Sequence, residues 1–144
     1  MKYLSHSLTE TEKIAQSFLE TEIKKPHAQA LIVALSGNLG SGKTTFMQAI
    51  CRTLAVKETV TSPTFVIEKF YKINYRGFTQ LVHIDAYRLD GGKDLFLLAW
   101  ERLIADPHNL IFIEWPEKVA DILSGSELKV GFTFINETDR ELEY

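Results

Sequence analysis

Residues 31–45 read LIVALSGNLGSGKTT, and they decide the fold class of this chain. Residues 31–35 form a short apolar run, as expected of a strand that is covered on both faces of a sheet. Residues 37–44 match the phosphate-loop pattern G-x-x-x-x-G-K-[ST]. Residues 44–54 then carry apolar side chains four positions apart, which indicates a helix. A strand, a glycine-rich loop and a helix in this order predict a phosphate-binding loop rather than a plain glycine turn.

The residue types in the loop suit a nucleotide. Glycines let the backbone curl so that amides point at phosphate oxygens, and the following helix adds its unpaired N-terminal amides. We expect Lys43 to reach the β- and γ-phosphates and Thr44 to ligate Mg²⁺. The residues expected to line the phosphates are Gly37, Asn38, Leu39, Gly40, Ser41, Gly42, Lys43, Thr44 and Thr45.

Two acidic residues follow apolar strands elsewhere in the chain. Asp85 comes after LVHI and Glu114 comes after LIFI. A carboxylate at the end of a strand next to the loop would enter the ligand crevice, where it can hold Mg²⁺ or orient a water molecule. Strand ends are also often acidic simply because solvent begins there. We predict that Thr44, Glu114 and Asp85 organise the metal, and which acid contacts it directly stays open.

Three further residues allow two interpretations. Thr64 lies in SPTF, between the loop helix and the next strand, where a hydroxyl can sense the γ-phosphate, although a proline turn explains this string equally well. Trp115 follows Glu114 and suits a lid, a partner contact or the core. His83 lies in a strand pattern and is more simply a satisfied core histidine than a ligand.

The remaining pattern indicates one α/β domain, residues 1–144, with a mixed parallel and antiparallel sheet flanked by helices. Helices are expected at 9–25, where Thr9 and Glu12 have capping-box spacing, at 93–104, and at 117–123. Strands are expected at 65–73, 80–87, 110–113 and 128–134. The link between 65–73 and 80–87 is too short for a crossover, so this pair should be antiparallel.

Composition narrows the class of protein. The 144 residues are 45% hydrophobic and 24% charged, which suits one packed core. There is no apolar run of the ~20 residues that span a membrane, and the start lacks the pattern of a secretory signal, so we expect a cytoplasmic protein. The net charge of −3 argues against DNA binding and for contact with RNA only through a partner. Cys51 is the only cysteine and reads as core.

Four motifs in order, GNLGSGKTTF, VTSPTFVIEKFY, VHIDAYRL and LIFIEWPE, resemble the TsaE family, formerly called YjeE. The resemblance covers roughly residues 7–140. It implies a small bacterial P-loop ATPase that uses ATP and Mg²⁺ and works with TsaB and TsaD. TsaD transfers threonylcarbamoyl to the tRNA adenosine next to the anticodon, and ATP hydrolysis by TsaE is expected to reset that assembly.

The resemblance also assigns roles to residues. It places Thr64 in a switch-like segment, Asp85 and Glu114 at the metal, and further nucleotide contacts near Thr9 and Arg140. Two departures stand out. Asn38 occupies a position where the family usually has Asp, and residues 90–103 carry Lys93 and apolar residues where the family commonly has glutamates before a glycine.

Two rival functions stay open from the sequence. A small metabolite or nucleotide kinase would need an arginine-rich lid, but the five arginines are scattered singly. A nucleotide-sensing module without a catalytic role fits the same residues as an ATPase. No guanine-selecting N-K-x-D motif is present. Because no arginine accompanies the loop, we expect the isolated chain to hydrolyse ATP slowly.

Overall fold

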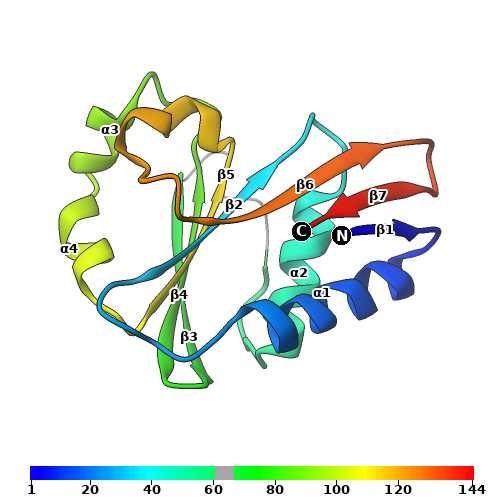
Figure 1. Ribbon diagram of the computed structural model, residues 1–144, viewed down its shortest axis with the longest axis horizontal. Helices are drawn as coiled ribbons and strands as arrows, with labels where there is room; N and C mark the ends of the chain where they lie inside the picture. Colours follow the sequence, from blue (N-terminus) through cyan, green and yellow to red (C-terminus); the bar gives the residue numbers. More distant parts are fainter. Residues whose placement is uncertain (61–66) are drawn as a thin grey trace.

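The computed structural model describes residues 1–60 and 67–144, and these form a mixed sheet with helices on both faces (Figure 1). In the described residues the sheet has seven strands. They are β1 (Lys2–Ser5), β2 (Leu31–Ser36), β3 (Glu68–Tyr75), β4 (Phe78–Asp85), β5 (Asn109–Glu114), β6 (Leu128–Phe134) and β7 (Arg140–Glu143). Their spatial order is β1-β7-β6-β2-β5-β4-β3. The predicted fold class is therefore confirmed.

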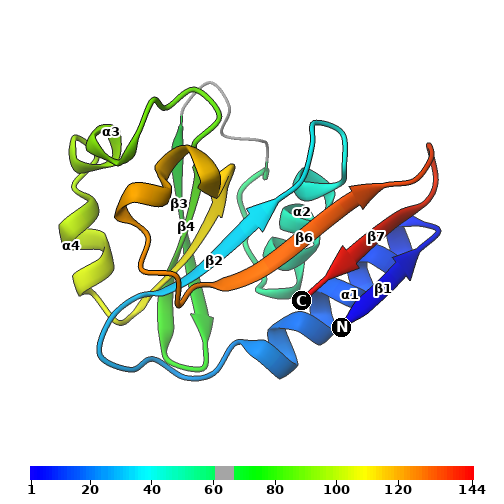
Figure 2. The same ribbon diagram turned by 45° about the horizontal axis from the view of Figure 1, so that its top comes forward.

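The helical elements divide between the two faces. They are α1 (Leu8–Glu22), α2 (Lys43–Thr53), α3 (Gly92–Phe96), α4 (Trp100–Ala105) and the 3₁₀ helix η1 (Pro116–Ile122). Helices α1 and α2 cover one face of the sheet, and α3, α4 and η1 cover the other (Figures 1 and 2). Side chains of a strand alternate between faces, so β4 and β5 contribute to both cores. For example, Phe112 packs on the side of α2 and Ile113 on the side of α3.

The strand directions bring several chain segments to one edge of the sheet. Strands β2, β5 and β4 are parallel, and β6 is parallel to β2. Their carboxyl ends therefore lie at the same edge, next to the loop between β2 and α2. Ligands of open α/β sheets bind at such an edge, where the strand order reverses. Here the reversal falls at β2, which lies between β5 and β6.

The predicted hairpin is confirmed. Strands β3 and β4 are antiparallel and are joined by Arg76 and Gly77, whose φ values of 51° and 97° suit a tight two-residue turn. The Arg76 guanidinium donates hydrogen bonds to the carbonyl oxygens of Glu20 and Ile23, at 3.0 and 2.6 Å. These bonds satisfy carbonyls at the end of α1 and tie the hairpin to that helix.

The helix predicted at 93–104 is wrong as one element. Two short helices, α3 and α4, replace it, and Ala99 between them has a φ of 58°. Leu95 and Trp100 are both buried, but they are five residues apart and would lie on different faces of a continuous helix. The chain breaks the helix so that both side chains reach the core.

The N-terminal cap of α1 and the two edge strands also differ from expectation. The capping residue is Ser7, whose hydroxyl accepts a hydrogen bond from the Glu10 amide at 3.2 Å, and not Thr9. Strands β1 and β7 pair with each other, which brings the two termini together (Figure 1). Each has only four residues, too few for a recognisable alternation. No helix in the described part of the chain is long and apolar enough to cross a bilayer.

Candidate functional site

A hollow lies at the carboxyl ends of β2, β4 and β5, beside the start of α2. Its volume is about 200 Å³, which is less than the roughly 300–1,000 Å³ of pockets that enclose a whole small molecule. It therefore suits a chain of phosphates better than a complete nucleotide. It is lined by Leu39, Gly40, Ser41, Gly42, Lys43, Thr44, Thr45, Asp85, Glu114, Trp115 and Arg140.

The loop backbone is shaped for an anion. Gly42 caps α2 with a φ of 108° and offers no side-chain cap, so the first amides of α2 are left for another acceptor. The turn is closed by a hydrogen bond of 3.1 Å from the Ser41 amide to the Asn38 carbonyl oxygen. A side chain at Gly37 would place its Cβ 2.6 Å from the Phe132 carbonyl oxygen on β6. Glycine is therefore required where the loop packs against that strand.

Lys43 occupies the floor of the hollow and is only 6% exposed. Its ammonium group donates hydrogen bonds to the carbonyl oxygens of Gly37 and Asn38, the latter at 3.1 Å. The same nitrogen lies 4.6 Å from the centre of the Trp115 ring. Burial lowers the pKa of Lys43, and the nearby carboxylates of Glu114 and Asp85 act in the opposite direction. The ammonium is thus held in place by neutral loop carbonyls that a phosphate oxygen could replace.

The two predicted acids lie side by side above Lys43. Asp85 and Glu114 are paired in the parallel register of β4 and β5, and they are 5% and 3% exposed. The Asp85 carboxylate accepts a hydrogen bond of 2.9 Å from the Tyr87 amide. Among the described residues, no group of three or more His, Cys, Asp or Glu side chains could hold a metal. Proteins usually bind Mg²⁺ through one or two carboxylates together with substrate phosphates, and Asp85 and Glu114 are two carboxylates that line the hollow.

Glu114 has a hydrogen-bond partner that was not predicted from the sequence. Its Oε2 lies 2.9 Å from Nε2 of His83. The interpretation of His83 as a core residue is correct in its burial, since the side chain is 1% exposed. However, its Nδ1 has no hydrogen-bond partner in the described structure, so the histidine is satisfied only on the side of Glu114. The alternation H-x-D, which puts His83 and Asp85 on one face of β4, was the available signal.

Trp115 is the aromatic residue that lines the hollow, and its ring contacts that of Tyr87. Their ring centres are 5.0 Å apart at an angle of 52°, and Tyr87 is exposed. Trp115 has a φ of 58°, so the chain turns sharply directly after Glu114. The indole lies over Lys43 and lines the hollow, and it also packs against the core on the α3 side of the sheet.

Arg140, near which the resemblance implies a nucleotide contact, lies beside the loop. The expectation that no arginine accompanies the loop is therefore wrong. A Cβ added at Gly42 would lie 2.9 Å from Cδ and 3.0 Å from Nη1 of Arg140. The arginine starts β7 and is far from the loop in sequence, so only the pairing of β6 with β7 brings the two together. Its positive charge lies next to the amides at the start of α2.

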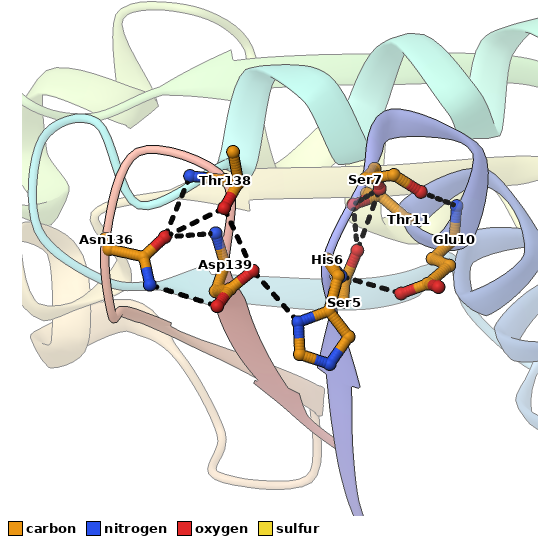
Figure 3. A network of polar contacts seen from close by, with 8 residues as sticks. All are labelled: Ser5, His6, Ser7, Glu10, Thr11, Asn136, Thr138 and Asp139. Carbon is orange, nitrogen blue, oxygen red and sulfur yellow. Dashed lines mark hydrogen bonds and ion pairs between the residues drawn. The ribbon is translucent and has the colours of Figure 1, made fainter.

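A polar network lies between the turn that follows β1 and the turn that precedes β7 (Figure 3). His6 Nδ1 and Asp139 Oδ1 are 2.9 Å apart, and the Asn136 amide donates to Asp139 Oδ2 at 2.9 Å. The bonds from Asn136 and His6 lower the pKa of Asp139, and the bond to Asp139 raises the pKa of His6. The network joins the β1–α1 turn to the β6–β7 turn directly before Arg140.

Other predicted site residues lie elsewhere. Thr9 is exposed on α1 and lines a separate hollow with Glu12 and Arg52. Gly37 and Asn38 do not line this hollow, but their carbonyl oxygens accept hydrogen bonds from Lys43. Both residues lie on the side of the loop that faces β6. Thr64 lies outside the described residues.

Fold and site define the class of protein. A glycine-rich loop between β2 and α2, with acids on neighbouring parallel strands, is the arrangement of an α/β protein with a P-loop NTPase-like fold. The crystal structure of YdiB from Bacillus subtilis has this fold, with a TM-score of 0.73 and 23% identity over 99% of this chain and 82% of that one.

Sequence comparison then identifies the family. The family model described as "Threonylcarbamoyl adenosine biosynthesis protein TsaE" matches residues 5–142, and this chain belongs to the TsaE family. The TsaE protein of Streptomyces coelicolor is 40% identical over 100 residues, which are 69% of this chain and 66% of that relative. The TsaE protein of Rickettsia felis is 34% identical over 132 residues, 91% of this chain and 71% of that relative. The resemblance noted from the four motifs is confirmed.

Proposed function

We propose that this chain binds Mg-ATP, hydrolyses it slowly when alone, and acts in the threonylcarbamoylation of tRNA adenosine together with TsaB and TsaD. The observation that supports ATP binding is the hollow at the carboxyl ends of β2, β4 and β5. It brings Lys43, the first amides of α2 and the carboxylates of Asp85 and Glu114 to one place. Positive groups for phosphate and oxygen ligands for a cation are the two requirements of an Mg-nucleotide site.

Different residues in the hollow contact the phosphates and the metal. The loop amides and Lys43 hold the β- and γ-phosphates, and Lys43 exchanges its loop carbonyl partners for phosphate oxygens. Thr44 and Glu114 are the oxygen donors for Mg²⁺, with Asp85 as a second ligand or as the group that positions water. Mg²⁺ supplies charge neutralisation on the phosphates. Thr64 stays a sequence-based proposal for sensing the γ-phosphate.

The nucleoside would extend beyond the hollow, because a volume of about 200 Å³ is smaller than that of pockets that enclose a whole small molecule. Arg140, beside Gly42, is the side chain best placed to follow it outward. The exposed Thr9 on α1 is the other proposed contact, and it is the more distant one because it lines a different hollow.

The role in tRNA modification is supported by the family and not by a surface on this chain. Relatives are named as tRNA threonylcarbamoyladenosine biosynthesis proteins over two thirds or more of this chain's length. Contact with tRNA would be indirect, through the complex with TsaB and TsaD. The negative net charge of −3 agrees with an indirect contact.

The test is ATP hydrolysis by this protein, alone and with TsaB and TsaD of the same organism, measured beside tRNA modification over many turnovers. We expect hydrolysis to rise with the partners and repeated modification to depend on it. Lys43→Ala should abolish both activities. Glu114→Ala should lose hydrolysis while retaining more nucleotide binding than Lys43→Ala. The matched control is Lys72→Ala, which removes an exposed lysine on β3 and should change neither activity.

Hydrolysis that is indifferent to the partners would remove the tRNA assignment and leave a nucleotide-binding protein. Transfer of phosphate to a small acceptor would favour a kinase instead. If Glu114→Ala hydrolyses ATP like the parent, the assignment of Glu114 to the metal is wrong.

A further inference from the structure

His83 is a buried polar residue directly beneath the proposed Mg²⁺ ligands. It lies two residues before Asp85 on β4, on the same face of the sheet, and its side chain is 1% exposed. In the parallel register His83 is opposite Phe112 on β5, and Glu114 is two residues further along that strand. The contact of 2.9 Å between Nε2 and Glu114 Oε2 therefore runs diagonally from the interior toward the hollow.

The direction of this hydrogen bond follows from the chemistry of the two groups. An ionised carboxylate can only accept, so Nε2 of His83 is the donor. Nδ1 of the same ring is buried and has no partner among the described residues. Most buried polar atoms in proteins are hydrogen-bonded, and an exception calls for a reason such as a functional role. Within residues 1–60 and 67–144, the hydrogen bond that the His83 side chain makes is the one to Glu114.

The bond restrains the carboxylate of Glu114. A glutamate side chain has a longer, more flexible stem than aspartate, and its carboxylate can rotate unless one oxygen is held. With Oε2 held by His83, the carboxylate is fixed while Glu114 still lines the hollow. Asp85, its neighbour in the register, is held differently, by the backbone amide of Tyr87. Each acid thus has its own anchor.

We propose that His83 is a positioning residue that orients Glu114 toward the Mg²⁺ of a bound nucleotide. This inference rests on the proposed function, because it assumes that Glu114 faces Mg-ATP. Carboxylates that bind metals are commonly fixed by such hydrogen bonds, and losing the partner typically costs 10–100-fold in metal affinity or activity. A histidine present only for packing would be replaceable by an apolar residue without any effect on the metal.

The experiment measures the binding of a non-hydrolysable ATP analogue in MgCl₂ and in EDTA, and takes the ratio of the two Kd values. His83→Gln keeps an N–H donor near the position of Nε2, whereas His83→Asn has a shorter side chain that cannot place one there. His83→Leu removes the donor altogether. Urea unfolding of each variant shows whether it is folded.

We expect His83→Leu and His83→Asn to weaken binding in MgCl₂ by about 10–100-fold and to leave binding in EDTA unchanged. His83→Gln should restore most of the Mg²⁺-dependent affinity. If His83→Leu does not fold, the comparison of His83→Asn with His83→Gln carries the same test, because both are polar.

Equal ratios of Kd in the parent, His83→Asn and His83→Gln would overturn the positioning role while leaving the proposed function intact. Equal losses in His83→Asn and His83→Gln would also overturn it, because the loss would then not follow the hydrogen bond. If the parent protein binds the ATP analogue no better in MgCl₂ than in EDTA, the proposed metal site is wrong. The proposed role of His83 is then wrong as well.

Discussion

Gly37→Ala tests whether the phosphate-binding loop is built on its contact with strand β6. The added Cβ would lie 2.6 Å from the Phe132 carbonyl oxygen and 2.7 Å from the Ser41 hydroxyl oxygen. Ser41 can rotate, but the carbonyl belongs to a paired strand and can only move with it. Overpacking of this kind costs about 1–3 kcal/mol, and we expect the upper half of that range because the obstacle is backbone and because alanine is also strained at the Gly37 φ of +156°.

The substitution should also weaken nucleotide binding. The Gly37 carbonyl oxygen holds the Lys43 ammonium, so a loop displaced from β6 moves the lysine away from the phosphates. The matched control is Gly125→Ala, where φ is +88° and no atom lies within 4 Å of the added Cβ. Its backbone strain costs ~1–2 kcal/mol, but Gly125 does not line the hollow that holds Lys43.

The assays are urea unfolding for stability and titration with a fluorescent ATP analogue for binding. Gly37→Ala should lower both, and Gly125→Ala should lower stability alone. The reasoning is refuted if Gly37→Ala unfolds at the same urea concentration as the parent. It is also refuted if Gly125→Ala weakens binding as much as Gly37→Ala does.

Two further predictions concern titratable groups. Burial raises the pKa of the Cys51 thiol to about 12, so roughly one molecule in 10⁴ carries a thiolate at pH 8. We expect no reaction with a thiol reagent in native buffer and complete reaction in guanidinium chloride; rapid native labelling would contradict the burial. The hydrogen bond to Asp139 raises the pKa of His6 above its ordinary value of 6.5. The stabilisation from the His6–Asp139 pair is therefore fully present below about pH 6.5, and it is lost as the pH rises through the pKa of His6 in the folded state. The Tm difference between the parent and His6→Ala should therefore shrink as the pH rises from about 6 to about 9. It should also shrink at high salt concentration, because the His6–Asp139 pair is exposed and salt screens exposed charges. A difference that does not change with pH would rule the pair out.

The elements that the sequence analysis predicted well have local signals. The loop and its flanking strand and helix lie within a few turns of chain, so spacing alone defines β2 and α2. The apolar runs that end in Asp85 and Glu114 are similarly local, and both acids do lie at strand ends. The helix expected at 93–104 failed because burial of Leu95 and Trp100 overrides helical periodicity. Propensity is a weak guide wherever tertiary packing competes with it.

By itself, the sequence determined the glycine-rich loop, the acids at the strand ends and the mixed α/β class, because each depends on residues close together in the chain. The tertiary structure decided which distant residues meet those groups. The pairing of β6 with β7 brings Arg140 to Gly42, and the register of β4 against β5 brings His83 to Glu114. Strand order and register are set by long-range packing of two cores, and no spacing within one segment records them.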